Sequence, residues 1–410
     1  MDVRLPNIRH LRVFNEVAKC KSISIAANRI HLSQPAVTQA ISNLEGKLGV
    51  ALFMRKNAGF QTTETGEMFR QRVERALAYL KAGARQCRIR EKGVKTRGFS
   101  NFEELVTSAQ IRALVAVAEA RNFSIAATNI GLSQPSVHRA ARNLESLSGV
   151  TLFEKISSGI MPTPAAEAFI KYVKLANAEI HQGVDEISLF NGQNTTVITV
   201  GSLPLPRSHV LPLAVNAMLQ SAPGVQIQVI DGPYATLIQR LRSGEIDCII
   251  GALRDPAPAD DVVQEQLFSD PLAIVSGKDH PLVGATEIGV QDLLAYPWLA
   301  PPKSAPAGKY LFDFLRIEDL EETPVRVISS SLIFLRGLLA QGNYLTIISR
   351  HQIREEVLHG SLVPLPIELA NSARPIGITV RQDWRPTEMQ SRFMAFLRKF
   401  GGEVDGENHT

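Results

Sequence analysis

The polar side chains between residues 33 and 42 have types and a spacing suited to binding the edges of nucleic-acid bases. A helix predicted over 34–46 presents small or hydrogen-bonding residues on one face: Ser33, Gln34, Pro35, Thr38, Gln39 and Ser42. Its other face carries the apolar Val37, Ile41 and Leu44, at the spacing of a buried helical stripe. A Gln side chain can form two hydrogen bonds with adenine, and Thr can contact the thymine methyl group. We therefore expect this helix to read DNA in the major groove.

The elements that must position this helix are recognisable around it. Two short helices are predicted before it, the first beginning near Pro6, and Gly49 is expected to end it. The following segment, LFMRKNAGFQTTETG, predicts a hairpin around residues 57–59, in which Arg55 and Lys56 could hold phosphates. Three short helices followed by a basic hairpin are typical of a winged helix-turn-helix, whose third helix lies in the major groove.

The same motif occurs a second time, 100 residues later. Residues 24–53 and 124–153 are identical at 18 of 30 aligned positions, so the chain carries a duplicated module. The second copy keeps the inward positions Val137, Ala141 and Leu144. Its outward positions, which are mostly changed, are Gln134, Ser136, His138, Arg139 and Arg142.

Two interpretations of the second copy remain open. Arg139 and Arg142 favour direct DNA contact, because Arg is the commonest reader of guanine. The charge of the segment favours a dimerisation or spacing role instead. Residues 98–192 hold 7 basic and 9 acidic residues, a net charge of −2, whereas phosphate neutralisation supplies most non-specific affinity for DNA.

The net charge of the whole chain, +4, conceals a strong asymmetry. Residues 1–97 hold 19 basic and 7 acidic residues, a net charge of +12. Residues 193–410 hold 18 basic and 24 acidic residues, a net charge of −6. A basic N-terminal region on an otherwise acidic chain predicts a polyanionic partner, double-stranded DNA, bound at that end.

Residues 7–66 resemble the DNA-binding domain of LysR-type transcriptional regulators. The resemblance rests on SQPAVTQAISNLEGKLGVALFMR followed by TTETG, and Thr38 stands where the family usually has Ser. It implies a bacterial, cytoplasmic regulator in which a long linker helix pairs with its copy in a second subunit. A second amphipathic helix carries an apolar seam suited to pairing with another helix: Phe169, Val173, Ala176, Ile180, Val184 and Ile187. We interpret this seam as favouring a homodimer, with packing against its own chain as the alternative.

The C-terminal half alternates short β-branched strands with helices, which predicts parallel sheets covered by helices. This half, with LRSGEIDCIIGALRDP and KDHPL, resembles the effector-binding domain of the same family. The resemblance implies two lobes similar to periplasmic solute-binding proteins. It further implies a small-molecule effector between the lobes, a homodimer or homotetramer, and RNA polymerase as a partner. The half is also similar to regulators of sugar or aromatic-acid catabolism, so a small aromatic or sugar acid is the expected effector.

Ligands of such folds bind at the carboxyl ends of strands and near helix N-termini. Loops at those places contain the expected effector-binding residues: Ser202, Leu203, Pro204, Asp231, Pro233, Pro302, Ser304, Ser330 and Ser331. The serines among them could donate hydrogen bonds to a ligand. An ordinary helix-capping role explains them equally well.

The predicted fold is multidomain, with two mainly-α winged helix-turn-helix modules and their linker helices preceding a two-lobed α/β effector domain. The expected segments are 1–66 (first module), 67–100 (linker helix and basic linker), 101–163 (second module), 164–192 (second linker helix) and 193–402 (effector domain). Within the effector domain, the first lobe is expected over about 196–272 and 376–400. The second lobe is expected over about 275–372.

Other function classes find little support in the sequence. No G-x-S-x-G, H-E-x-x-H, Walker or paired-cysteine motif is present, so we expect no enzyme, no metal and no cofactor. No signal peptide or membrane-length apolar run is seen, which favours the cytoplasm and no membrane contact. The alternative is a solute-binding or redox-sensing protein whose second helix-turn-helix is only a structural or dimerisation module. Three scattered cysteines, Cys20, Cys87 and Cys248, leave a thiol sensor open.

Overall fold

The computed structural model describes residues 5–56, 59–90, 98–157 and 159–407. The chain divides into two compact units. The first runs from the N-terminus to Val197 and includes residues 224–226 and 242–246, and the second comprises the remaining residues.

The first module consists of three helices and a hairpin. Its elements are α1 (Ile8–Cys20), α2 (Ile23–Arg29), α3 (Gln34–Leu48), β1 (Phe53–Lys56) and β2 (Gly59–Thr62). The side chain of Ser33 caps α3 by accepting a hydrogen bond from the Ala36 N–H at 3.4 Å. Gly49 ends α3 with φ of 69°, a left-handed conformation that suits glycine.

The second module repeats this order. Its elements are the 3₁₀ turn η1 (Phe102–Glu104), α5 (Ser108–Ala120), α6 (Phe123–Ile130), α7 (Gln134–Ser148), β3 (Phe153–Ile156) and β4 (Gly159–Pro162). Ser133 and Gly149 serve α7 as Ser33 and Gly49 serve α3. The duplication seen in the sequence is therefore a duplication of structure at the level of caps and turns.

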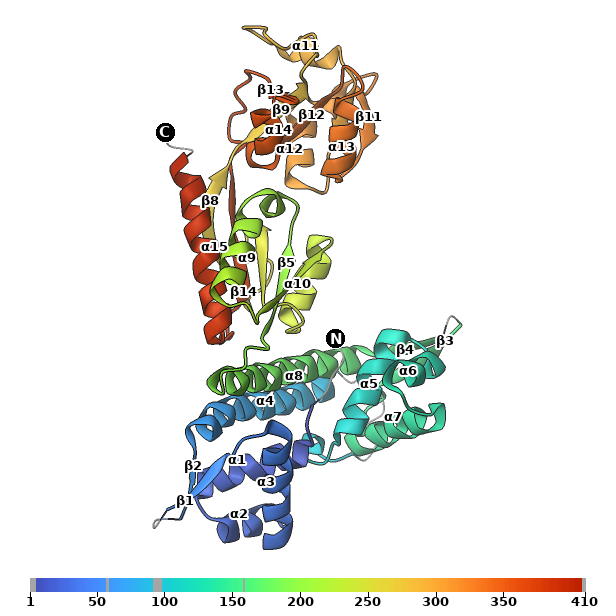
Figure 1. Cartoon of the computed structure of the whole chain (residues 1–410). Coiled ribbons are helices and arrows are strands. Elements are labelled where there is room, and N and C mark those ends of the chain that lie inside the picture. The colour runs from blue at the N-terminus through green and yellow to red at the C-terminus, as the bar shows by residue number, and fades with distance from the viewer. Residues whose placement is uncertain (1–4, 57–58, 91–97, 158, 408–410) are drawn as a thin grey trace. The chain divides into compact units, whose positions relative to one another are not determined.

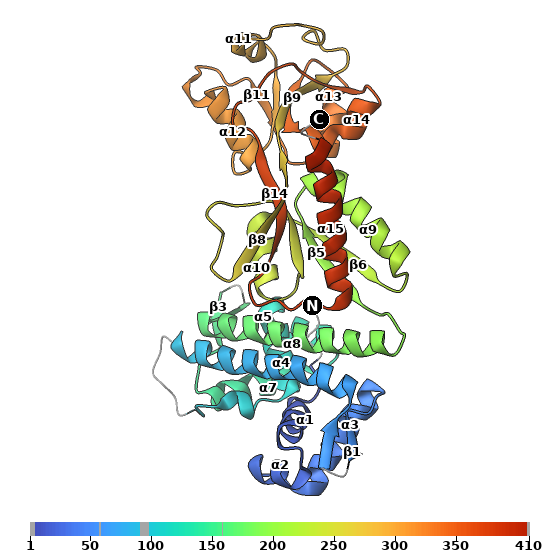
Figure 2. The same ribbon diagram turned by 90° about the vertical axis from the view of Figure 1, so that its left-hand side faces the viewer.

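Each module continues into a long helix, α4 (Glu64–Ile89) after the first and α8 (Pro164–Phe190) after the second. These two helices lie side by side over much of their length (Figures 1 and 2). The apolar seam of α8 is buried against elements of its own chain, with Phe169, Val173 and Ile180 at most 2% exposed. The inference that this seam favours a homodimer is thus wrong, because the partner of α8 is α4.

The second unit contains two five-stranded sheets. The first has the order β6-β5-β7-β14-β8 and the second the order β11-β10-β12-β9-β13. The strands are β5 (Val197–Ser202), β6 (Gln226–Asp231), β7 (Cys248–Ala252), β8 (Val262–Asp270), β9 (Leu272–Gly277), β10 (Trp298–Ala300), β11 (Val325–Ile328), β12 (Leu345–Ser349), β13 (Leu362–Pro364) and β14 (Arg374–Arg381).

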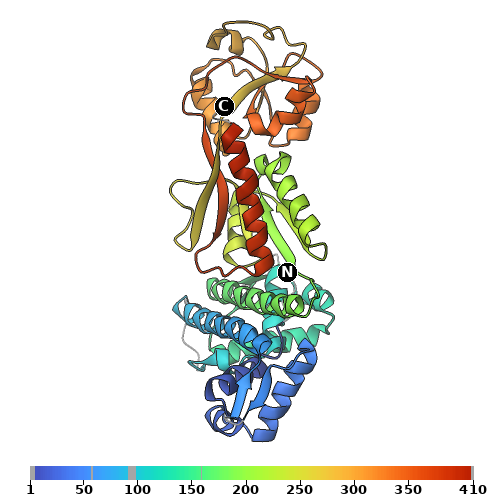
Figure 3. The same cartoon turned by 60° about the vertical axis from the view of Figure 1, so that its left-hand side comes forward.

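Both sheets are mixed, so the expectation of parallel sheets is corrected. β5 pairs with β7 in parallel, but β14 is antiparallel to both β7 and β8. In the second sheet β9 is antiparallel to both β12 and β13. The strands that run against their neighbours are β9 and β14. The chain enters the second sheet through β9, directly after β8, and returns to the first sheet through β14 (Figure 3).

Helices cover these sheets, and short turns connect them. The helices are α9 (Val210–Ser221), α10 (Tyr234–Arg242), α11 (Val290–Leu294), α12 (Pro306–Phe314), α13 (Leu332–Leu339), α14 (Arg354–Leu358) and α15 (Glu388–Glu407). The 3₁₀ turns are η2 (Leu205–Ser208), η3 (Ile317–Asp319) and η4 (Arg350–Ile353). The second lobe has its own core around the fully buried Trp298.

Candidate nucleic-acid interface and effector region

The exposed face of α3 carries the polar residues that the sequence singles out. Gln34, Pro35, Thr38, Gln39 and Ser42 are all exposed, as is the capping Ser33. The inward residues Val37, Ile41 and Leu44 are at most 5% exposed.

Two of the exposed side chains on α3 are already oriented by the helix itself. The Thr38 hydroxyl donates to the Gln34 carbonyl at 3.1 Å. Gln39 Nε2 donates to Asn43 Oδ1 at 2.9 Å. This bond leaves the Gln39 side-chain oxygen and the second N–H of its amide for other partners. These bonds reduce the rotamer freedom that contact with a base edge would otherwise remove.

The hairpin after α3 is held to that helix by Glu45. Glu45 Oε1 accepts hydrogen bonds from the backbone N–H groups of Leu52, at 2.7 Å, and Phe53, at 3.3 Å. On the hairpin, the Arg55 guanidinium lies 5.6 Å from the centre of the Phe60 ring and is exposed. The side chain of Lys56 and the turn residues Asn57 and Ala58 lie outside the described residues.

The exposed face of α7 has the same geometry with different chemistry. Gln134, Ser136, His138, Arg139 and Arg142 are exposed. Arg142 pairs with Glu145 at 2.7 Å, and the Ser136 hydroxyl lies 2.8 Å from that of Ser133. The His138 ring lies 5.0 Å from the Phe123 ring. The exposed side chains of α7, like those of α3, make hydrogen bonds within their own module, and Arg142 is additionally held by an ion pair.

In the first lobe, three candidate loops follow β5, β6 and β7. The Ser202 side chain is fully buried and its hydroxyl donates to the Leu203 carbonyl at 3.0 Å, so it is engaged within the chain. Pro204, Asp231 and Pro233 are exposed. Asp231 pairs with Arg207 of η2 at 3.3 Å, which brings the loops after β5 and β6 together.

Tyr234 and Arg254 join this group, although the sequence reasoning missed them. The Arg254 guanidinium lies 4.7 Å from the centre of the Tyr234 ring. The Tyr234 hydroxyl is buried and makes no hydrogen bond with the described residues. Burial raises the pKa of Tyr234 above its ordinary value, and the positive charge of Arg254 opposes that rise. The position of Arg254 just after β7 is the signal that could have revealed it.

The candidate residues of the second lobe lie at the N-terminal ends of its helices. Pro302 is half-buried, and Ser304 and Ser330 are exposed. Ser331 caps α13, its hydroxyl accepting a hydrogen bond from the Phe334 N–H at 3.4 Å. Of the two interpretations of the serines, helix capping and ligand contact, the structure thus shows capping for Ser331.

A buried carboxylate marks the place where the chain crosses between the lobes. Asp270, at the end of β8, is fully buried. Its oxygens accept from the Ser349 hydroxyl at 2.5 Å and from Arg374 at 2.9 Å, and lie 2.7 Å from His351 Nδ1. A charge-assisted network of this kind ties β8, β12 and β14 to one another.

Other chemistry finds little support in the structure. Burial raises the pKa of the Cys20 and Cys248 thiols above their ordinary value, which disfavours the reactive thiolate of a redox sensor. In the described part of the chain, no group of His, Cys, Asp or Glu side chains could hold a metal ion. Among the described helices, none is long and apolar enough to cross a membrane.

Comparison with known proteins finds matches for both units of the chain. Residues 8–67 and 108–167 each match the bacterial regulatory helix-turn-helix of the lysR family, and residues 191–401 match the LysR substrate binding domain. The HTH-type transcriptional regulator GalR of Pseudomonas putida is 31% identical over 402 residues, which are 97% of this chain and 98% of that protein. The two proteins are thus of nearly equal length.

Two further comparisons involve proteins that cover about three-quarters of this chain. The HTH-type transcriptional regulator PcaQ of Agrobacterium fabrum is 28% identical over 302 residues, 74% of this chain and 97% of PcaQ. A full-length OxyR variant from Pseudomonas aeruginosa covers 72% of this chain and 93% of its own, with a TM-score of 0.53 and 22% identity, a likeness of fold. The chain belongs to the LysR family of DNA-binding transcriptional regulators, with a substrate-binding domain after its helix-turn-helix segments.

Proposed function

We propose that this regulator recognises its operator mainly through α3 and holds the DNA backbone with the first hairpin. The observation that carries this proposal is the exposed Gln34–Thr38–Gln39–Ser42 face beside a hairpin anchored by Glu45. Gln and Thr side chains at the start of a helix can reach base edges in the major groove. Arg55 and Lys56 supply phosphate contacts, in the region of the chain with net charge +12.

The second module contributes a weaker and different contact. Arg139 is exposed on α7 and suits guanine, whereas Arg142 must first leave Glu145. The net charge of −2 in residues 98–192 gives this module little general attraction to phosphates. We therefore assign it a secondary DNA contact.

The effector is a small aromatic or sugar acid that binds where the loops after β5, β6 and β7 meet. Arg254 supplies a cation for the carboxylate and the buried Tyr234 hydroxyl supplies a donor. Leu203, Pro204 and Pro233 supply apolar contacts, and from the second lobe Pro302, Ser304 and Ser330 complete the site. The effector acts by binding one arrangement of the lobes better than another, and contact with RNA polymerase follows from the regulatory role.

Oligomers of this chain form through the effector domain, because α8 already packs on α4. A homodimer or homotetramer built in that way brings several helix-turn-helix modules to one operator. Differential affinity of the effector for the lobe arrangements then shifts the assembly and the bend of the DNA.

Matched alanine pairs on the two recognition helices test the DNA-reading role. The full-length protein first selects a duplex from random sequence, and footprinting then maps the contact. Thr38→Ala with Gln39→Ala is expected to weaken binding to that duplex at least tenfold and to erase preference at the bases involved. His138→Ala with Arg139→Ala, at the equivalent positions, is expected to cost less. Equal affinity of the first variant and the wild type would refute reading by α3.

Deleting residues 1–97 would be a poor version of this experiment. It removes α4 and leaves the apolar face of α8 uncovered. Lost binding could then result from unfolding of the second module. The point variants leave both helices in place.

A further inference from the structure

The contacts between α4 and α8 follow the pattern of a two-fold axis that passes between the two helices. A Cβ built on Gly83 of α4 would lie 2.7 Å from Tyr172 Cβ and 3.1 Å from the Phe169 ring of α8. A Cβ built on Gly183 of α8 would lie 2.9 Å from the Phe69 ring and 3.1 Å from Arg72 Cβ of α4. The contacts of residue 83 with residues 172 and 169 are thus repeated by the contacts of residue 183 with residues 72 and 69. Such reciprocal contacts are those of an antiparallel helix pair with two-fold symmetry.

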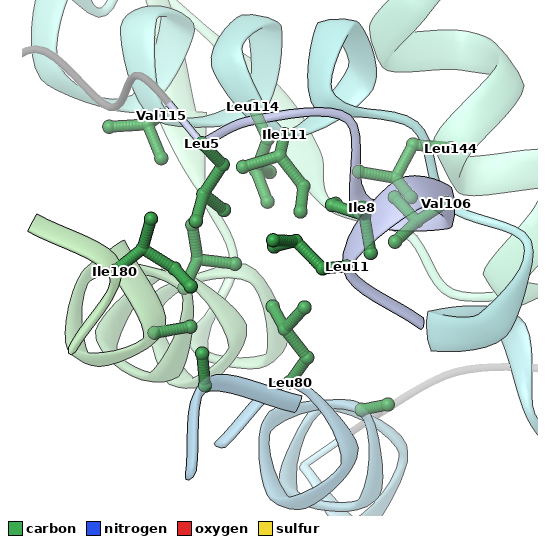
Figure 4. Close-up of a cluster of buried hydrophobic side chains, with 14 of the residues drawn as sticks. Leu5, Ile8, Leu11, Leu80, Val106, Ile111, Leu114, Val115, Leu144 and Ile180 are labelled. Carbon is green, nitrogen blue, oxygen red and sulfur yellow. The ribbon is translucent and has the colours of Figure 1, made fainter. Parts of the chain in front are cut away.

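The core between the modules follows the same symmetry. Leu11 and Ile111 are equivalent residues of α1 and α5, and Leu80 and Ile180 are equivalent residues of α4 and α8. All four are at most 2% exposed. Figure 4 shows them in one cluster that both modules share. The interface therefore has the form of an isologous dimer contact made within one chain.

The polar contacts of this interface break the symmetry. Arg72 of α4 donates to Glu186 at 3.1 Å, to Glu179 at 3.1 Å and to Gln182 at 3.0 Å, all on α8. Arg75 donates to the same Glu179 at 2.8 Å. The Arg72 and Glu179 side chains are only 7% and 6% exposed. Burial lowers the pKa of Arg72, but the hydrogen bonds and charges of Glu186 and Glu179 outweigh it and raise that pKa above its ordinary value.

The residues equivalent to this polar group by the two-fold axis are uncharged. Position 172, equivalent to Arg72, is Tyr, and position 175, equivalent to Arg75, is Leu. The positions equivalent to Glu179, Gln182 and Glu186 are Tyr79, Ala82 and Gln86. The arginines of this polar group are therefore on α4 only, and the carboxylates that accept their hydrogen bonds are on α8 only.

This arrangement discriminates between possible helix pairs. An α4–α4 pair from two chains would bury two Arg72 side chains opposite Tyr79, Ala82 and Gln86. An α8–α8 pair would bury two sets of Glu179 and Glu186 without a cation. A buried charge without its partner is strongly destabilising, so the polar group permits α4 to pair with α8 and opposes both like pairs.

A second pair of equivalent positions carries reversed charges. In the first module Lys19 of α1 pairs with Glu74 of α4 at 2.9 Å. In the second module Glu119 of α5 pairs with Lys174 of α8 at 2.7 Å. Exchange of the two long helices between modules would place Lys19 against Lys174 and Glu119 against Glu74. Each three-helix body is thereby matched to its own long helix.

We propose that one chain alone forms a complete two-headed DNA-reading unit whose heads are unequal, and that its target contains two different half-sites. The inference rests on the proposed DNA-reading role of α3. A two-fold protein matches a two-fold operator, and here the axis relates Thr38, Gln39 and Ser42 to His138, Arg139 and Arg142. The two half-sites of the operator should therefore be arranged about a two-fold axis, as the two heads are, but should differ in base sequence.

Complementation between chains tests whether the pairing is internal. The first variant, Arg72→Tyr with Arg75→Leu, gives α4 the residues that stand at the equivalent positions of α8. The second variant, Glu179→Tyr with Gln182→Ala and Glu186→Gln, gives α8 the residues of α4. Both sets in one chain should restore thermal stability and DNA affinity relative to either set alone. Mixing the two variant chains should restore neither, and recovery on mixing would overturn internal pairing.

A cross-link keeps this test decisive if a variant fails to fold. The rings of Tyr79 and Tyr172 lie 6.4 Å apart. In a chain with Cys20, Cys87 and Cys248 replaced by Ala, Tyr79→Cys with Tyr172→Cys should be joined by a short bismaleimide at the mass of one chain. Two chains that each carry one of these cysteines should yield no product of double mass. A double-mass product would show that the helices pair between chains.

Symmetrised duplexes test the unequal heads. From the duplex selected by the full-length protein, two derivatives are made in which one half-site is replaced by the inverted copy of the other. The selected duplex should bind at least tenfold better than one or both derivatives. Equal affinity for all three would overturn the unequal heads. Failure to select any duplex would instead contradict the DNA-reading role itself.

Discussion

Glu45 of α3 and Leu52 at the base of the first hairpin are joined by a hydrogen bond of 2.7 Å, from the Leu52 N–H to the Glu45 carboxylate. Glu145 and Leu152 repeat the bond in the second module at 2.9 Å. Each carboxylate also accepts from the next backbone N–H, that of Phe53 or Phe153. The duplication therefore allows the same two backbone hydrogen bonds to be removed from either head, and at Glu145 the ion pair with Arg142 is removed with them.

Glu45→Ala and Glu145→Ala should cost similar stability and different DNA affinity. Each leaves two backbone N–H groups without an acceptor, a loss of roughly 1–3 kcal/mol. Only Glu45 positions the hairpin that carries Arg55. Glu45→Ala should therefore weaken binding to the selected duplex at least fivefold more than Glu145→Ala. Thermal unfolding followed by circular dichroism, with gel-shift titrations, measures both. Equal losses of affinity would assign the two hairpins equal roles.

Substitution of the interface glycines should loosen the pairing of α4 and α8. A methyl group on Gly83 or Gly183 meets a facing side chain at 2.7–2.9 Å, and such overpacking typically costs about 1–3 kcal/mol. Gly46 of α3 is a matched control, because a Cβ there meets nothing within 4 Å. Gly46→Ala should raise stability by up to about 1 kcal/mol through helix propensity. Unfolding midpoints compare the three, and an unchanged Gly83→Ala would contradict the close approach.

Much of the first unit could be predicted from the sequence, because its signals are local. The stop at Gly49 and the outward set on α3 follow from spacing alone. The partner of the α8 seam does not follow, since an apolar stripe such as Phe169–Val173–Ile180 fits any helix of matching shape. The difference between Arg72 and its equivalent Tyr172 is visible in the sequence. Its role in pairing α4 with α8 is seen only in the structure, where Arg72 contacts the carboxylates of α8.

The second unit was less predictable for a physical reason. Strand β8 reads VVQEQLFSD and, having few apolar residues, lacks the continuous apolar run expected of a buried parallel strand. It pairs with β14 in the antiparallel sense, which made the expectation of parallel sheets wrong. Ser202 and Ser331 look alike in the sequence, yet one is fully buried and the other caps a helix. Burial of a serine at the end of a strand depends on tertiary packing that spacing does not encode.

Asp270→Asn should weaken the connection between the lobes. The buried carboxylate accepts hydrogen bonds from Arg374 and Ser349 and contacts His351. The neutral amide of Asn would leave the arginine without its counter-charge. We expect a loss of about 3–5 kcal/mol, as for removal of one partner of a buried ion pair. Asp231→Asn is the control, because Asp231 is 72% exposed opposite Arg207 and its loss should cost no more than about 1 kcal/mol. Urea unfolding measures both, and equal small effects would deny Asp270 this role.

His280 should make the second unit less stable in mild acid. It is 3% exposed, its Nδ1 accepts from the Leu282 N–H at 3.1 Å, and burial lowers its pKa below the ordinary value. The unfolded chain therefore binds a proton near pH 6.5 that the folded chain does not bind. The contribution of His280 to stability is full above about pH 6.5. It is lost as pH falls toward the lowered pKa, with a slope of at most about 1.4 kcal/mol per pH unit.

His280→Asn isolates this effect. An Asn side chain can still accept from the Leu282 N–H, but it does not titrate. The chain's two tryptophans, Trp298 and Trp384, both lie in the unit that contains His280, so tryptophan fluorescence during urea unfolding reports on that unit. Between pH 7 and pH 5 the wild type should lose more stability than the variant, whatever their difference at pH 7. Parallel losses in the two proteins would mean that His280 is not buried in its neutral form.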